Sequence, residues 1–286
     1  MSLLQAFQTS PGLFITTVIA LSLAIGSFLN VVIHRLPKMV ERAWRAEIAE
    51  MDGQTPATGP AYNLVVPRSQ CPACNHQITA YENVPLISYI VLGGKCSSCK
   101  ARISLRYPLV EALTGALSGY VAWRFGFSWH TASALIFVWS MIALAFIDLD
   151  TFYLPDDITL PLVWAGLIAN MGGIFVDLQT AVIGAVGGYL ALWCVFWAYK
   201  FATGKDGMGY GDFKLLAAIG AWLGWKMLPV VILVSSSIGA VLGIALIVFA
   251  RHGRDVPIPF GPYLVLGGLV ALFWGDSLVQ FYLQSP

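Results

Sequence analysis

Hydrophobic positions in this chain gather into long windows that contain no Asp, Glu, Lys or Arg. Six such windows cover residues 13–33, 125–147, 158–176, 178–199, 227–250 and 256–275. Each is near or above the roughly 20 residues that a helix needs to cross about 30 Å of hydrocarbon. Because helices satisfy their own backbone hydrogen bonds, the windows predict membrane-spanning helices.

Two further segments carry a weaker signal of the same kind. Residues 108–123 are interrupted only by Glu111, and residues 215–225 form a short apolar stretch between Lys214 and Lys226. The short stretch can cross with snorkelling lysines or local thinning of the bilayer, or cross only in part. The pattern therefore predicts an all-α polytopic membrane protein with about eight transmembrane helices.

Composition agrees with a chain that lies mostly in lipid. Hydrophobic residues make up 58% of it and charged residues 11%, whereas a soluble domain carries about 25% charged residues. The net charge of +1 gives no sign of a polyanionic partner, so we expect no nucleic-acid binding. The first window is too long for the apolar part of a signal peptide, and no small-residue cleavage site follows it, so we expect a permanent span.

Lysine and arginine residues predict the orientation in the membrane. If all eight segments cross with the N-terminus outside, 14 of the 16 Lys and Arg fall on one side. The positive side faces the cytoplasm. We therefore expect an inner-membrane protein with residues 1–33 as its first transmembrane helix, residues 34–106 as a cytoplasmic domain, and residues 107–286 as a multi-helix membrane domain. Within the cytoplasmic domain, residues 39–51 predict a short helix and residues 53–60 a linker.

Four cysteines in the 34–106 domain form two CxxC pairs. They are Cys71, Cys74, Cys96 and Cys99. Each pair places two thiolates on one tight turn, and two facing turns make a tetrahedral site that suits Zn²⁺, with iron as the alternative. Two disulfides or a redox-active pair stay open, although a reducing cytosol disfavours disulfides. Because this domain has little core, we expect the metal to supply much of its folding free energy.

Acidic residues cluster at two predicted span ends on the cytoplasmic side. The first cluster follows the window 125–147 and holds Asp148, Asp150, Asp156 and Asp157. The second contains the sequence Gly209-Tyr-Gly211-Asp212. Two adjacent carboxylates can share a proton, so that one activates a water molecule while the other polarises a peptide carbonyl. The pattern thus favours aspartyl proteolysis, without deciding between Asp148 and Asp150 as the partner of Asp212.

Other interpretations of these acidic groups stay open. They can be solvated loop residues or helix caps, with Asp157 placed to cap the helix that starts at Ile158. Glu111 can pair with a basic group, bind the amino group of a substrate, or lie near the membrane interface. At the level of function, a non-catalytic membrane-anchored zinc-knuckle adaptor and a proton-coupled transporter compete with the peptidase.

Six motifs together give the chain a resemblance to a known family. They are GSFLNVVIHRLP (26–37), CPAC…CSSC (71–99), RYPLVE (106–111), IDLDTFYLPD (147–156), GMGYGDFKLL (207–216) and PIPFGPYL (257–264). Over nearly its whole length the chain resembles the type IV prepilin leader peptidase/N-methyltransferases. The resemblance implies a GxGD-type aspartyl peptidase whose catalytic residues are Asp148 and Asp212.

The resemblance also implies substrates and a cofactor. The substrates are prepilins and type II secretion pseudopilins, cut after the Gly of a basic leader that precedes a hydrophobic helix. S-adenosyl-L-methionine then methylates the new N-terminal residue. Gly94 resembles a position linked to methylation, with a glycine required by the turn as the alternative. We further hypothesise that Asp156, Asp157 and Asp206 attract the basic leader.

Overall fold

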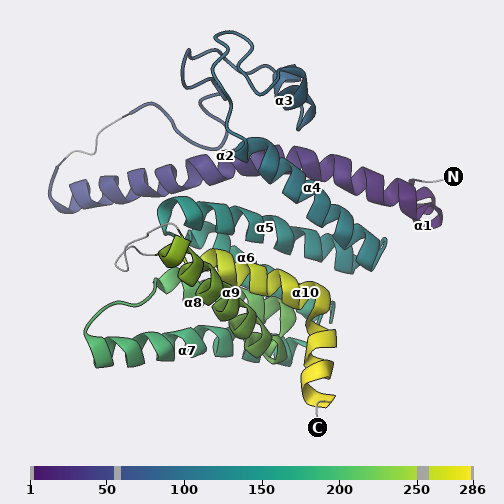
Figure 1. The fold of residues 1–286 in the computed structure, drawn as a ribbon, viewed down its shortest axis with the longest axis vertical. Helices are drawn as coiled ribbons and strands as arrows, with labels where there is room; N and C mark the ends of the chain where they lie inside the picture. The colour runs from purple at the N-terminus through teal and green to yellow at the C-terminus, as the bar shows by residue number, and fades with distance from the viewer. Residues whose placement is uncertain (1–2, 55–58, 250–257, 285–286) are drawn as a thin grey trace. The chain divides into compact units, whose positions relative to one another are not determined.

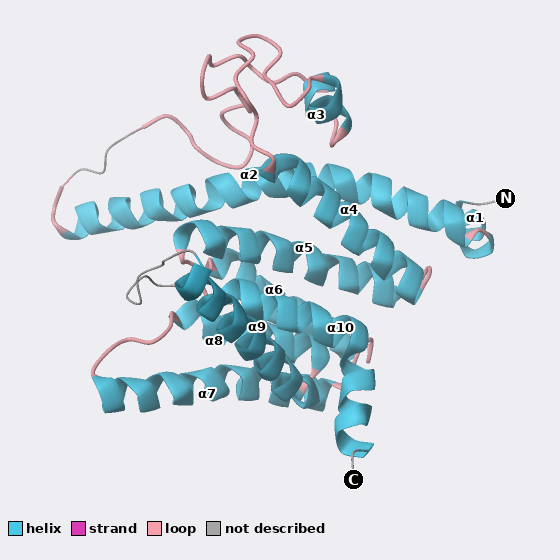
Figure 2. Cartoon of the chain, viewed as in Figure 1, coloured by secondary structure: helices cyan, strands magenta, loops and turns pink. Residues whose placement is uncertain are grey.

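The computed structural model describes residues 3–54, 59–249 and 258–284 (Figure 1). Within these ranges the chain is helical and contains no β-strand (Figure 2); its extended pairing is limited to two isolated bridges. The α-helices are α1 (Leu3–Thr9), α2 (Pro11–Met51), α3 (Ile87–Val91), α4 (Arg106–Phe125), α5 (Trp129–Thr151), α6 (Asp156–Met171), α7 (Leu178–Thr203), α8 (Tyr210–Leu223), α9 (Leu228–Phe249) and α10 (Gly261–Gln284). The predicted all-α class is confirmed.

Among the described residues, five helices are long and apolar enough to cross a membrane. They lie within residues 11–51, 129–151, 178–203, 225–245 and 261–281. The expected number of eight crossings is not confirmed. Helix α6 has 16 residues and α8 has 14, and at 1.5 Å per residue α8 is only about 21 Å long. The protein is a multi-pass membrane protein that also contains short helices.

Helix α2 differs from its prediction. It runs without a break from Pro11 to Met51, so the first apolar window and the expected short helix 39–51 are parts of one helix. Pro37 lies inside it and removes one backbone donor. Good helix formers such as Ala, Glu, Arg and Met follow Pro37 and continue the helix. The domain boundaries of residues 1–33, 34–106 and 107–286 stay a prediction; the expected linker 53–60 falls partly on residues outside the described ranges.

The chain divides into two compact units, Met1–Ala143 and Leu144–Pro286. In the first unit α2 packs along α4, and small residues permit the close approach. A Cβ added to Gly26 would lie 2.8 Å from the Cα of Glu111, and one added to Gly115 would lie 2.8 Å from Leu23 Cδ2. Such small-residue contacts are typical of helix pairs in membranes, where close packing replaces the hydrophobic effect.

In the second unit α8 is the central helix. It is buried from Asp212 to Leu223 apart from Lys214, and it contacts α6, α7 and α10. A Cβ on Gly184 of α7 would lie 2.2 Å from the carbonyl oxygen of Gly220 in α8. Because neighbouring helices enclose α8, its short length leaves no backbone group facing lipid alone.

Asn170 fixes the C-terminal end of α8. Its Nδ2 donates to the carbonyls of Ala221 and Trp222, both at 2.9 Å. Its Oδ1 accepts from the backbone N–H groups of Phe175 at 3.0 Å and Val176 at 3.2 Å. One buried amide thus satisfies four backbone groups of two segments. This attachment sets the position of α8 along α6, and with it the position of Asp212 at the opposite end.

Candidate active site and metal centre

Asp148 lies in the last turn of α5 and is buried. Its Oδ2 accepts a hydrogen bond of 3.0 Å from the backbone N–H of Gly261. Gly261 is the first residue of α10, and the free N–H groups of a helix N-terminus favour an anion. A Cβ at Gly261 would lie 2.6 Å from Oδ2, so glycine is the residue that allows this approach.

Asp212 is the third residue of α8 and is also buried. Its N–H donates to the carbonyl of Gly209, the N-cap residue, at 3.2 Å. Gly211 beside it packs against Leu154, because a Cβ at Gly211 would lie 2.8 Å from Leu154 Cβ. The glycines before Asp212 therefore bring the N-terminus of α8 against the turn that follows α5.

Leu154 connects the surroundings of the two aspartates. Its Cδ1 lies 3.3 Å from the Cβ position of Gly211 and 3.3 Å from that of Gly261. The carboxylate of Asp148 is close enough to act electrostatically on that of Asp212. The structure therefore brings these two predicted residues together within the second unit, while Asp150 is exposed.

The other acidic residues near the pair have different surroundings from those expected. Asp157 does not cap α6: the N-cap residue is Pro155, no side chain caps this end, and Asp157 is the second helical residue. The prediction was wrong because the helix begins at Asp156, two residues earlier than the apolar pattern indicates. The carboxylate of Asp156 accepts from Lys214 Nζ at 2.7 and 2.8 Å, which links the starts of α6 and α8. Asp206 pairs with Lys200 at 2.9 Å.

The four predicted cysteine ligands lie together in the first unit. Their sulfur atoms are all within 4.8 Å of one another. The Sγ atoms of Cys71 and Cys99 are 3.8 Å apart, and those of Cys74 and Cys96 are 4.0 Å apart. Sulfur atoms at the corners of a tetrahedron around Zn²⁺ would be about 3.8 Å apart, given a Zn–S bond of about 2.3 Å. The donor set and its spacing fit a zinc ion.

Both CxxC turns have the same backbone arrangement. In the first, the N–H of Asn75 donates to the carbonyl of Cys71 at 2.9 Å; in the second, the N–H of Lys100 donates to that of Cys96 at 3.1 Å. Asn75 and Lys100, which directly follow the pairs, have φ angles of +58° and +61°. Two equivalent turns that face each other form the knuckle pair expected from the spacing.

Two of the four clustered thiols have shifted pKa values. Backbone N–H groups of Cys99 and Ser98 lower the pKa of the Cys96 thiol to about 6. The N–H of Ala101 lowers the pKa of Cys99, but the neighbouring cysteine side chains and burial raise it to about 11. Four thiolates repel one another at this distance, and a divalent cation would remove the repulsion.

A polar network that the sequence did not reveal joins the two knuckles. His76 Nε2 lies 3.2 Å from Glu82 Oε1 and 3.2 Å from Ser97 Oγ. Glu82 also accepts from the N–H of Thr79 at 2.8 Å. Hydrogen bonds from Ser97 and Thr79 lower the pKa of Glu82 to about 2. Only the folded loop places these residues side by side, since of the four only Ser97 lies within a recognisable motif, the second CxxC pair.

Gly94 and Glu111 have clear local explanations. Gly94 has φ +66°, and a Cβ there would lie 2.7 Å from Tyr89 Oη. The turn into the second knuckle therefore requires glycine, and the link of Gly94 to methylation stays a prediction. Glu111 is buried and accepts the backbone N–H of Leu86 at 2.9 Å.

Comparison with known proteins places the chain in a family. Residues 20–125 match the bacterial peptidase A24 N-terminal domain, and residues 135–244 match the type IV leader peptidase family. No solved structure matches the chain.

Relatives that match over the whole chain carry one common name, "Prepilin leader peptidase/N-methyltransferase". The protein from Aeromonas hydrophila is 56% identical and the one from Pseudomonas aeruginosa is 55% identical, each over 285 residues, which cover 99% of this chain and 98% of the relative. The protein from Stutzerimonas stutzeri is 53% identical over 99% of each chain. The chain therefore belongs to the type IV leader peptidase family and carries that family's bacterial N-terminal domain.

Proposed function

We propose that this chain cleaves the basic leader of prepilins and type II secretion pseudopilins and then methylates the new N-terminal residue. The observation that carries the proposal is the pairing of Asp148 and Asp212, which lie on different helices but next to glycines that pack on the same leucine. Relatives named for both activities support it over the whole length of the chain. The adaptor and transporter alternatives have no comparable support.

In the proposed reaction the two carboxylates act as a pair. One, ionised, takes a proton from a water molecule, and the oxygen of that water attacks the scissile carbonyl. The other, protonated, donates a hydrogen bond to the carbonyl oxygen. As the tetrahedral intermediate collapses, the departing amine takes up the proton that the first carboxylate accepted from the water. The Gly261 N–H holds Asp148 in place during these steps. The titration belongs to the pair rather than to either residue.

The orientation in the membrane explains how the substrate reaches the pair. We place both aspartates and residues 34–106 at the cytoplasmic face of the inner membrane, on the positive-inside distribution of Lys and Arg. The hydrophobic helix of a prepilin stays in lipid, so its scissile bond is held at the interface. Asp156 and Asp206 already neutralise lysines, so the attraction for the basic leader rests on Asp157, which is exposed.

The proposed cofactors serve different parts of the protein. Cys71, Cys74, Cys96 and Cys99 would hold Zn²⁺ with a structural role, since no ligand position is left open for a reaction. S-adenosyl-L-methionine would supply the methyl group for the new N-terminal amine.

Mass spectrometry of a prepilin incubated with the detergent-solubilised enzyme, with and without the methyl donor, tests the proposal. We expect the intact chain to remove the leader and, with the donor, to add one methyl group. Asp148→Asn and Asp212→Asn should each abolish cleavage, whereas Asp150→Asn, at an exposed position of the same helix end, should retain it. Leader removal by either of the first two variants would refute the assignment.

Substitutions at two neighbouring glycines test methylation separately from leader cleavage. Gly93 and Gly94 have similar φ angles of +60° and +66°, but a Cβ at Gly93 meets nothing within 4 Å, whereas one at Gly94 meets the Tyr89 ring. We expect Gly94→Ala to lose methylation while leader cleavage continues, and Gly93→Ala to keep both activities. Equal methylation by the two variants would remove Gly94 from the proposal.

A further inference from the structure

Helix α3 carries apolar side chains that no described residue of the first unit covers. Ile87, Ile90 and Val91 are exposed to 61, 76 and 77% of their full extent. Residues 81–92, here called the α3 segment, contain one charged residue, Glu82. This apolar surface belongs to the domain that the charge distribution places outside the membrane, so its exposure needs an explanation.

The α3 segment is attached to residues that lie within the predicted apolar windows of the membrane helices. Asn83 Oδ1 lies 3.5 Å from Ser27 Oγ, and Ser27 falls within the 13–33 window. The Leu86 N–H donates to Glu111, which falls within residues 108–123. Figure 1 shows α3 beside the stretch of α2 that α4 crosses. Glu111 lies five residues beyond Arg106, which is about 7.5 Å along the helix axis.

The attachment through Glu111 is specific. The N–H of Ile87 donates to the carbonyl of Pro85 at 2.6 Å, which closes a three-residue turn with Leu86 at its centre. Leu86 has φ +58°, and bulky residues rarely adopt such a conformation. The turn leaves the Leu86 N–H free to reach the Glu111 carboxylate. A buried carboxylate is costly without such partners, so this contact fixes where α3 begins.

We propose that the α3 segment lies in the membrane interface, with Ile87, Ile90 and Val91 in contact with lipid acyl chains. Interfacial helices bury their apolar faces by about 5–10 Å, which agrees with the depth of the Glu111 attachment. Four basic residues follow the segment and suit anionic headgroups; they are Lys95, Lys100, Arg102 and Arg106. The membrane then holds the cysteine knuckles at a set depth, through a segment of their own domain.

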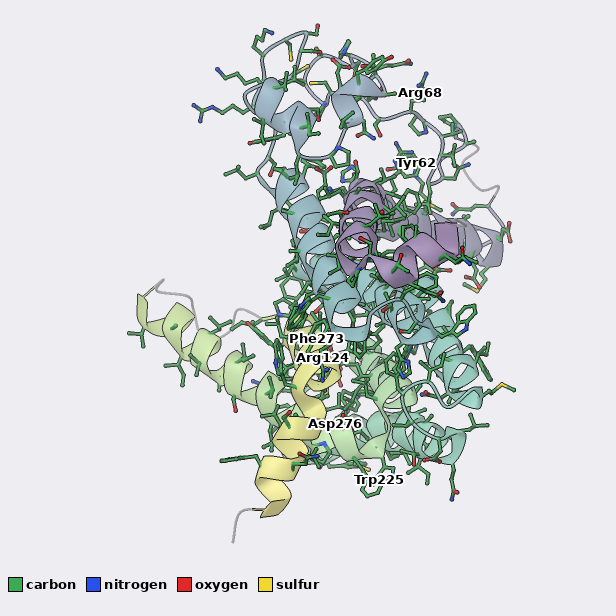
Figure 3. All side chains as sticks on the ribbon, turned by 90° about the vertical axis from the view of Figure 1, so that its right-hand side faces the viewer. Tyr62, Arg68, Arg124, Trp225, Phe273 and Asp276 are labelled. Atoms are coloured by element: carbon green, nitrogen blue, oxygen red, sulfur yellow. The ribbon has the colours of Figure 1, made fainter. Side chains whose placement is uncertain are left out.

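The same unit provides a matched control position. Val65 is exposed to 77%, the same fraction as Val91. It lies two residues from Asn63, whose carbonyl accepts from Arg35 at 3.0 Å, and Arg35 is beyond the 13–33 window. Figure 3 shows Tyr62, a neighbour of this stretch, on the loop beside α2; its ring lies 4.2 Å from the guanidinium of Arg42. Val65 should therefore be in water, at equal exposure and with an identical side chain.

Photo-crosslinking in vesicles tests the proposal. The full chain carries a photoreactive benzophenone amino acid in place of Val91 or of Val65, in vesicles of phosphatidylethanolamine and phosphatidylglycerol, and the crosslinking is done without prepilin and repeated with it. We expect a phospholipid adduct with the probe at Val91 and loss of that adduct with the probe at Val65. No lipid adduct at Val91, equal adducts at both positions, a crosslink to a second copy, or a crosslink that forms only when prepilin is added would each overturn it.

Two variants of Glu111 test the attachment with the probe kept at Val91. Glu111→Gln retains an oxygen that accepts the Leu86 N–H, whereas Glu111→Ala removes it. We expect the lipid adduct to persist in Glu111→Gln and to be lost in Glu111→Ala. Persistence in both variants would refute the role of Glu111 as the anchor. If Glu111→Ala does not fold, the comparison of Val91 with Val65 in the otherwise unchanged chain still decides the proposal.

Discussion

Gly261→Ala should strongly lower the activity of the proposed peptidase although it replaces neither aspartate. The Cβ added by this substitution would lie 2.6 Å from Asp148 Oδ2 and 3.0 Å from its Cγ. Ordinary van der Waals contact begins at 3.4 Å, so Oδ2 must move away by about 0.8 Å. The 3.0 Å hydrogen bond from the Gly261 N–H would then lengthen to about 3.8 Å, beyond the range of hydrogen bonds.

A displacement of this size is large for a catalytic group. Misplacement by about 1 Å can reduce a rate about 100-fold. We therefore expect Gly261→Ala to lower kcat/KM for leader cleavage by about two orders of magnitude, with the larger effect on kcat because the carboxylate acts in the chemical step. Single-turnover cleavage of a prepilin, followed by mass spectrometry, measures this change.

Gly187→Ala in α7 is the matched control. It adds the same methyl group in the same unit, but its Cβ meets Leu228 Cδ1 at 3.5 Å, an ordinary contact. This variant should keep the activity of the unchanged chain, and both variants should show the same thermal unfolding midpoint. Gly261→Ala with full activity would refute the inference that Asp148 is held in place by this contact, and with it the geometric basis of the proposed site.

Other perturbations test the supports of the two sites. Asn170→Ala leaves two buried and two partly buried backbone groups without their partner and should lower the free energy of unfolding by about 3 kcal/mol; an unchanged thermal midpoint would contradict this. Cys71→Ser should release zinc, measured by metal analysis, and lower methylation more than cleavage. Metal analysis that finds no zinc in the purified protein without substitutions would exclude the metal site. Replacing Asp156 and Lys214 by alanine, singly and together, should give a coupling free energy of about 0.5 kcal/mol in a double-mutant cycle, because both groups are partly exposed. A coupling of zero would contradict a stabilising ion pair.

Local patterns were sufficient for the elements and for the cysteine site. Charge-free windows predict helices because a buried backbone in lipid has few other ways to satisfy its hydrogen bonds. The CxxC spacing predicts the knuckles because each ligand pair lies within one turn. In both cases the decisive interactions join residues that are close in the sequence, so a single chain without relatives already shows them.

Contacts between segments that are distant in the sequence could be identified only from the tertiary structure. The local pattern did not decide between Asp148 and Asp150 as the partner of Asp212, and only the family resemblance pointed to Asp148. In the structure Asp148 accepts a hydrogen bond from Gly261, which lies more than a hundred residues away. It also merged two expected helices into α2, enclosed the short α8 among its neighbours, and joined Glu111 to Leu86. The sequence determined which segments are helical and which residues can react. Which side chains meet depends on how the helices pack, and that packing is set by many small contacts that no local pattern records.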